Sequence, residues 1–109
     1  MNKVILIGNI GQKPETKNFE NGSVTNFTLA TNRKYKTADG WQSETEWHNI
    51  EAFGKLGSEV LQKYADKGSK VSIVGRIKTV KFSKDNTERY FTKIICEDLE
   101  LLDKKTDSN

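Results

Sequence analysis

Hydrophobic and polar residues alternate along most of the chain, which is the pattern of β-strands that bury one face. Turn-forming residues fall between the alternating stretches. Asn21-Gly22 and Asp85-Asn86 are the clearest of these turn signals. The pattern therefore predicts five strands, over residues 4–10, 24–35, 44–53, 70–84 and 89–102.

One segment between the third and fourth predicted strands has a helical period instead. Apolar residues from Leu56 to Tyr64 recur at helical spacing, and Gly68 suits a C-terminal cap. Five strands with one short α-helix between strands 3 and 4 is the order of the OB-fold, a five-stranded Greek-key barrel that binds oligonucleotides on one face. We therefore predict an all-β OB-fold over residues 1–102 and a short polar tail at 103–109, which we expect to be disordered.

The third predicted strand places aromatic rings on its polar face. Successive side chains of a strand point to opposite sides. Trp47 and Phe53 therefore share a face with Asn49 and Glu51, whereas Ile50 and its apolar neighbours lie on the other. The alternation predicts that two large rings are exposed to solvent.

The same feature recurs on two further strands. In the fourth predicted strand Phe82 shares a face with Arg76 and Lys78, and the opposite set, which includes Ile77, is predicted to pack in the core. Tyr35 lies within a basic run near the end of the second strand. A single such ring is equally well explained by packing at a barrel end, but four rings on three strands favour a binding surface.

Exposed rings among cations are suited to unpaired nucleic acid, because bases stack on the rings and cations neutralise the phosphates. The predicted stacking residues are Trp47, Phe53, Tyr35 and Phe82. The predicted phosphate-binding residues are Arg33, Lys34, Lys36, Lys55, Arg76, Lys78, Lys81 and Lys84. Trp41 lies in the polar segment 36–43, predicted to be a loop, where it is either an additional stacking ring or a loop anchor.

The net charge is +3, but basic and acidic residues are concentrated in different segments of the chain. Residues 1–36 carry six cations and two acidic residues, and residues 70–96 carry seven cations and two acidic residues. Residues 37–69 and 97–109 are acidic overall. Basic blocks indicate a protein that binds a polyanion, although a solvated basic surface would have the same composition.

The sequence carries no arrangement typical of an enzyme. Glu44, Glu46 and His48 share a strand face, but consecutive positions on one face lie roughly 7 Å apart, too far to hold one ion. No phosphate-binding glycine loop is present, and Cys96 is the single cysteine. We therefore predict no catalytic residue, no metal and no cofactor. The lone cysteine and the lack of an apolar run of roughly 18 residues predict a cytoplasmic protein without a membrane span.

Two short motifs, Thr45-Glu46-Trp47-His48-Asn49 and Phe53-Gly54-Lys55-Leu56, are specific enough to suggest a family. Together with the opening stretch 2–11, they make the chain resemble the bacterial single-stranded DNA-binding proteins over residues 2 to about 102. Further matching segments are residues 27–31, 64–69, 74–77 and 89–90.

The resemblance implies an OB-fold homotetramer that wraps single-stranded DNA in replication, recombination and repair, and is associated with the nucleoid. Trp47 and Phe53 match family stacking positions, whereas Tyr35 and Phe82 fall at positions that usually hold tryptophan. His48 matches a histidine that lies at a subunit contact in the family. Trp41 has no counterpart in the family.

Two expectations stay open. The family usually ends in an acidic tip with a Pro-Phe pair that recruits other proteins, whereas this sequence ends with polar residues up to Asn109, so such recruitment is in doubt. From the residues alone, an RNA-binding or protein-binding OB module, or a purely structural role, fits as well. The preference for DNA over RNA rests on the resemblance.

Overall fold

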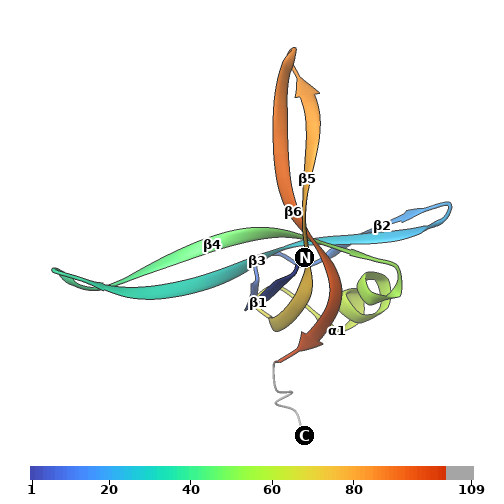
Figure 1. Cartoon of the computed structure of the whole chain (residues 1–109). Coiled ribbons are helices and arrows are strands. Elements are labelled where there is room, and N and C mark those ends of the chain that lie inside the picture. The colour runs from blue at the N-terminus through green and yellow to red at the C-terminus, as the bar shows by residue number, and fades with distance from the viewer. Residues whose placement is uncertain (103–109) are drawn as a thin grey trace, which may run out of the picture.

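The computed structural model of the chain describes residues 1–102, which form one barrel with projecting hairpins (Figure 1). The strands are β1 (Val4–Ile10), β2 (Glu15–Phe19), β3 (Gly22–Thr37), β4 (Gly40–Phe53), β5 (Lys70–Lys84) and β6 (Thr87–Leu101). A π-helical turn, η1 (Leu56–Leu61), runs into the short α1 (Gln62–Tyr64). No helix within the described residues is long and apolar enough to cross a membrane. The predicted polar tail, residues 103–109, lies outside the described residues.

The sheet closes on itself. Its strands follow the order β1-β5-β6-β4-β3-β2, and β1 pairs with β3 as well as with β5. In the closing pair, Ile10 lies opposite Leu29. Within residues 1–102 the pairings are antiparallel except that of β4 with β6, where Ile50 lies opposite Ile94. This closed barrel with its short helix confirms the predicted OB-fold.

The barrel interior is filled by the inward-facing residues of the strands. Leu29 of β3 and Ile50 of β4 are almost completely buried, and Leu61 of the helical segment joins the same core. A Cβ added to Gly57 would collide with the side chain of Thr25, so the helical segment lies directly on β3. The outward faces of the barrel strands are therefore the surfaces left for binding.

Three hairpins of the described chain, β2–β3, β3–β4 and β5–β6, project from the barrel in different directions (Figure 1). The β3–β4 ladder is continuous from Val24 opposite Phe53 to Thr37 opposite Gly40. At the end of the β5–β6 hairpin, Asp85 and Asn86 have φ values of 52° and 63°. This left-handed geometry is that of a tight hairpin turn and confirms the predicted turn.

The structure differs from the predictions in four places. The first is β2, which was not predicted because its residues are mostly polar and form a strand only by pairing with β3. With this additional strand, the helical segment follows the fourth strand of the chain and not the third. The helical segment ends at Tyr64 with Ala65 as its C-cap, so Gly68 lies beyond the helix and does not cap it.

Segment 36–43 is two strand ends joined by a short turn, and Trp41 therefore lies in β4. The prediction that Ile77 packs in the core is wrong: it is 47% exposed, because β5 leaves the barrel after Gly75.

Candidate nucleic-acid interface

The outward face of β4 presents two aromatic rings from the wall of the barrel. Trp47 is 60% exposed and Phe53 is 54% exposed, whereas Ile50 and Ala52, which lie between them in the sequence and point the other way, are buried. The predicted alternation on this strand is confirmed. The strand that holds both rings in solvent is thus anchored by its other face in the core.

Trp47 is seated on the backbone of the segment that follows β1. A Cβ added to Gly11 would collide with the Trp47 ring and with the Thr28 hydroxyl, so the ring lies directly over this glycine. A hollow beside the ring is lined by Gly11, Gln12 and Thr28. One side of the indole is therefore fixed by packing while the remainder is open to solvent, which suits a platform for stacking.

The β3–β4 hairpin carries a second tryptophan near its tip. Trp41 is 70% exposed and lies opposite Lys36 in the ladder, so the two side chains share one face. Lys34 and Ser43 form the next pair on that face, and with Trp41 they line an open hollow of about 490 Å³. A ring this exposed contributes little packing to the turn, which favours the stacking alternative over the loop anchor.

Tyr35 lies on the opposite face of the same hairpin. It is opposite Gln42 in the ladder, one position out of phase with Trp41. The Arg33 guanidinium lies 5.0 Å from the centre of the Tyr35 ring and also donates a hydrogen bond of 3.2 Å to Glu44. The structure therefore does not bring Tyr35 and Trp41 onto one surface, and a strand of DNA that touches both rings must pass around the hairpin.

The β5–β6 hairpin carries exposed rings on both of its faces. Phe82 lies opposite Arg89, and Phe91, two residues further along β6, shares that face. Tyr90 is on the other face, opposite Lys81. Phe91 and Tyr90 are not among the predicted stacking residues. The predicted Asp85-Asn86 turn sets the register of this hairpin, and that register was sufficient to predict the face on which each ring lies.

Three of the eight predicted phosphate-binding cations have acidic partners. These ion pairs are Arg33–Glu44 at 3.2 Å, Arg76–Glu97 at 3.4 Å and Lys81–Glu88 at 2.7 Å. The pairs are exposed and therefore weak, so that a phosphate can compete with the carboxylate for each cation. The other predicted cations make no ion pair with any residue of the described chain: Lys34, Lys36, Lys55, Lys78 and Lys84.

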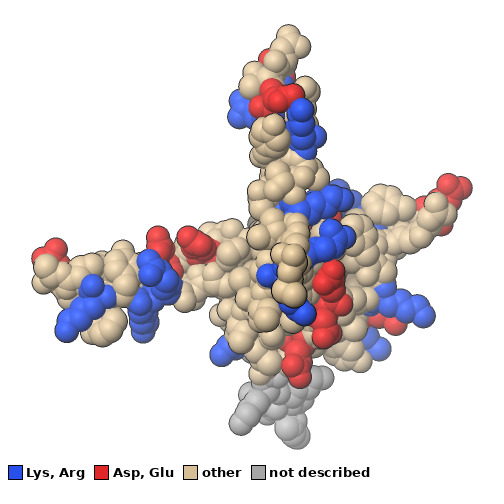
Figure 2. Space-filling view, in the orientation of Figure 1, with Lys and Arg blue, Asp and Glu red and all other residues tan. Residues whose placement is uncertain are grey.

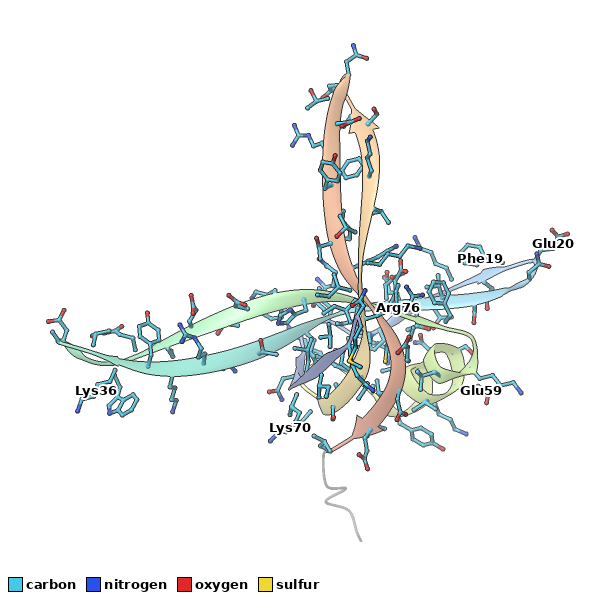
Figure 3. All side chains as sticks on the ribbon, viewed as in Figure 1. Phe19, Glu20, Lys36, Glu59, Lys70 and Arg76 are labelled. Atoms are coloured by element: carbon cyan, nitrogen blue, oxygen red, sulfur yellow. The ribbon has the colours of Figure 1, made fainter. Side chains whose placement is uncertain are left out.

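The cations of the site are spread over more than one projection of the molecule. Figure 2 shows Lys and Arg side chains gathered on the β3–β4 hairpin and on the β5–β6 hairpin. In Figure 3, Lys36 lies toward the far end of the β3–β4 hairpin, whereas Arg76 lies where the β5–β6 hairpin leaves the barrel. The positive charge is therefore arranged to follow a long polyanion and not to enclose a small one.

His48 points away from the tryptophan rings. It alternates with Trp47 along β4, is half-buried, and its Nε2 atom lies 2.8 Å from the hydroxyl of Thr31. Glu44 and Glu46 share its face, but no three His, Cys, Asp or Glu side chains within residues 1–102 are grouped so that they could hold a metal ion.

The closed barrel, the outward rings and the cations on two of the hairpins define an OB-fold protein with an open nucleic-acid-binding face. The chain belongs to the single-strand binding protein family, whose family model matches residues 1–102. It is a non-enzymatic protein that binds single-stranded DNA, and proteins of its family form oligomers.

Curated relatives show how far the similarity extends. The single-stranded DNA-binding protein of Bacteroides thetaiotaomicron is 46% identical over 110 residues, which cover 96% of this chain and 68% of the relative. Single-stranded DNA-binding protein 1 of Chlorobaculum tepidum is 42% identical over 109 residues, covering 96% of this chain and 67% of the relative. The chain thus spans about two thirds of the length of these relatives.

Solved structures show the same architecture. A Plasmodium falciparum single-stranded DNA-binding protein, solved in complex with single-stranded DNA, superposes with a TM-score of 0.85 at 32% identity, covering 94% of this chain and 96% of that one. The small single-stranded DNA-binding protein from Streptomyces coelicolor superposes with a TM-score of 0.75 at 21% identity, covering 93% and 95%. The second similarity concerns the fold alone.

Proposed function

We propose that this chain coats and protects unpaired DNA in replication, recombination and repair, without selecting a particular sequence. The observation that carries the proposal is the exposure of Trp47 and Phe53 on β4, a strand whose opposite face is buried in the core. A ring held in this way offers a flat apolar surface to any base, because every base has a π-face. We also propose that it acts in the cytoplasm, at the nucleoid.

Base stacking supplies the contacts that hold the strand to the barrel. Trp47 and Phe53 are six residues apart on β4, which is roughly 20 Å along an extended strand. Each stacked base contributes roughly 1–3 kcal/mol. Tyr35, Trp41 and Phe82 extend the set of rings onto the hairpins and give the DNA a curved path.

Phosphate neutralisation supplies the part of the affinity that depends on salt. Lys34 and Lys36 accompany Trp41, and Lys78 accompanies Phe82 on the same face of β5. Each phosphate that such a cation neutralises on a single strand contributes about −0.7 to the slope of log affinity against log salt concentration. The affinity therefore falls steeply as salt rises, whatever the sequence.

We propose a homotetramer as the assembled form, with His48 at a contact between subunits. Two features of the barrel support an assembly. His48 is held by Thr31 on the face of β4 opposite Trp47, so a contact there leaves the tryptophan free. Strand β1 exposes Ile5 and Ile7, and neighbouring apolar side chains on a surface mark association sites. We expect a bulkier residue at position 48 to lower the sedimentation coefficient of the assembly, and an unchanged value would argue against this role.

A fluorescence titration tests the proposed function. We expect oligo-dT to quench the tryptophan emission and to bind far more tightly than duplex DNA of equal length, at two salt concentrations. Equal affinity for the duplex would contradict the proposal, because stacked pairs do not offer their faces to the rings. Tighter binding of an RNA strand of the same sequence would assign the surface to RNA instead.

A further inference from the structure

A groove of about 240 Å³ runs along the outer face of the barrel next to the proposed stacking rings. Asn26 and Asn49, together with the Glu51 and Lys93 side chains, line it, and Phe91 of β6 stands at one side. Gln12 and Thr28 line this groove and also the hollow beside the Trp47 ring, so the two depressions are adjacent. Its volume lies below the roughly 300 Å³ of pockets for drug-sized molecules, which suits a single nucleobase.

The floor of the groove is polar and is built from cross-strand pairs. Asn26 lies opposite Glu51, and Thr28 lies opposite Asn49, so all four side chains share the outward face of β3 and β4. The Glu51 carboxylate accepts a hydrogen bond of 2.9 Å from the Lys93 ammonium, and both side chains are only 19% exposed. This pair is the most enclosed of the ion pairs between the described residues.

Lys13 and Glu15, one cation and one anion, also line the groove. At the enclosed Glu51–Lys93 floor, the chemistry suits the edge of a base and not a phosphate. Lys93 is neutralised by Glu51, and the carboxylate would repel a phosphate placed in the groove. A carboxylate accepts hydrogen bonds and donates none, and its two oxygens hold more lone pairs than Lys93 uses. The amides of Asn26 and Asn49 both donate and accept, so they adapt to either kind of partner.

We propose that this groove binds one base by its Watson–Crick edge and favours cytosine over thymine or uracil. The N4 amine of cytosine donates to the free acceptor position of Glu51, and its N3 and O2 atoms accept from Lys93. Thymine and uracil place a carbonyl oxygen where cytosine has its amine, and that oxygen faces the carboxylate. This inference rests on the proposed function and adds a base preference at one position to a surface that otherwise binds any sequence.

Oligomers of deoxycytidine and deoxyuridine of equal length test the proposal, because their bases differ only at position 4 and in the N3 proton. The measured quantity is the ratio of the two association constants, at one pH and one salt concentration. We expect Glu51→Gln to lower the dC-to-dU ratio about fivefold, the lower end of the discrimination of a base contact. Glu46→Gln is the matched control, since it removes the same charge from the opposite face of β4 and leaves the ratio unchanged.

Glu51→Gln leaves Lys93 without its partner, so the double variant Glu51→Gln/Lys93→Gln provides a second measurement with no unpaired enclosed charge. We expect the double variant to lose the same preference, with thermal unfolding confirming that both proteins fold. A ratio unchanged in both variants, or lowered equally by Glu46→Gln, would overturn the proposed base preference while leaving the proposed function intact. Failure of the unaltered protein to bind either oligomer would instead overturn the proposed function itself.

Discussion

The barrel and the hairpins that project from it use the same strands in different ways. In the barrel, the alternation of side chains along β4 separates a buried face, with Ile50, from an exposed face, with Trp47. Beyond the barrel, the β3–β4 and β5–β6 hairpins are exposed on both faces. On the hairpins, alternation determines on which face a side chain lies but not whether it is buried. Tyr35 and Trp41, for example, lie on opposite faces and are both exposed.

This difference assigns separate tasks to the two regions. The barrel holds rings in fixed places, since the Trp47 ring is packed over Gly11. The hairpins extend rings and cations away from the core, where the backbone ladder and exposed side-chain pairs such as Arg33–Glu44 and Lys81–Glu88 hold them. We therefore expect the barrel to dominate stability and affinity, and the hairpins to contribute reach and charge.

The largest expected effect is on stability, within a single strand. Ile73 and Ile77 lie on the same face of β5, but Ile73 is fully buried in the barrel and Ile77 is exposed on the hairpin. Ile73→Ala should lower the free energy of unfolding by about 2–5 kcal/mol, because it leaves a cavity. Ile77→Ala should change it by about 0.5 kcal/mol or less. Urea unfolding of the two variants measures the difference, and equal losses would show that the hairpin is packed like the barrel.

The next effect is on affinity and compares the two tryptophans. Trp47→Ala should weaken binding to oligo-dT by about 1–3 kcal/mol at fixed salt, because a seated ring loses a stacked base. Trp41→Ala should cost less, since Trp41 is 70% exposed and no contact within the described chain, like that of Trp47 with Gly11, fixes its ring before DNA binds. Anisotropy of a labelled oligonucleotide measures both variants. A larger loss for Trp41 would place the main stacking site on the hairpin.

A smaller effect is expected on the salt dependence of DNA affinity, and it distinguishes two cations of the β3–β4 hairpin. Lys36 makes no ion pair with a residue in 1–102, whereas Arg33 is paired with Glu44 at 3.2 Å. Lys36→Gln should reduce the steepness of the log affinity against log salt plot by about 0.7. Arg33→Gln should reduce it by less, because the carboxylate already offsets part of that charge. Identical slopes for the two variants would show that the ion pair opens completely when DNA binds.

The last comparison concerns the barrel interior at alkaline pH. Burial raises the pKa of the Cys96 thiol to about 11 from an ordinary value of 9.0. The folded state therefore holds this proton more tightly than the unfolded state, so stability is lost as the pH rises from about 9 to about 11. Cys96→Ala should remove that part of the alkaline decline, which unfolding in urea across this pH range measures. An unchanged decline would assign it to other groups.

The sequence was sufficient to predict the barrel and the faces of its central strand. The alternation from Trp47 to Phe53 and the Asp85-Asn86 turn depend on local geometry, because side-chain direction repeats every two residues and a tight turn is chosen by its own residues. The short helix follows from the change of period at Leu56. β2 could not be predicted in this way, since its polar residues become a strand through their pairing with β3.

The tertiary structure alone decided where the strands leave the barrel and what lies across from each ring. Ile77 is as apolar as Ile73, yet its side chain is 47% exposed, and the remote residue that reaches it, Asn2, makes hydrogen bonds only to its backbone. The seat of Trp47 on Gly11 and the enclosed Glu51–Lys93 pair likewise join residues far apart in the chain. Alternation along a strand determines the direction of a side chain, but its burial and its partners depend on long-range packing, which no local pattern contains.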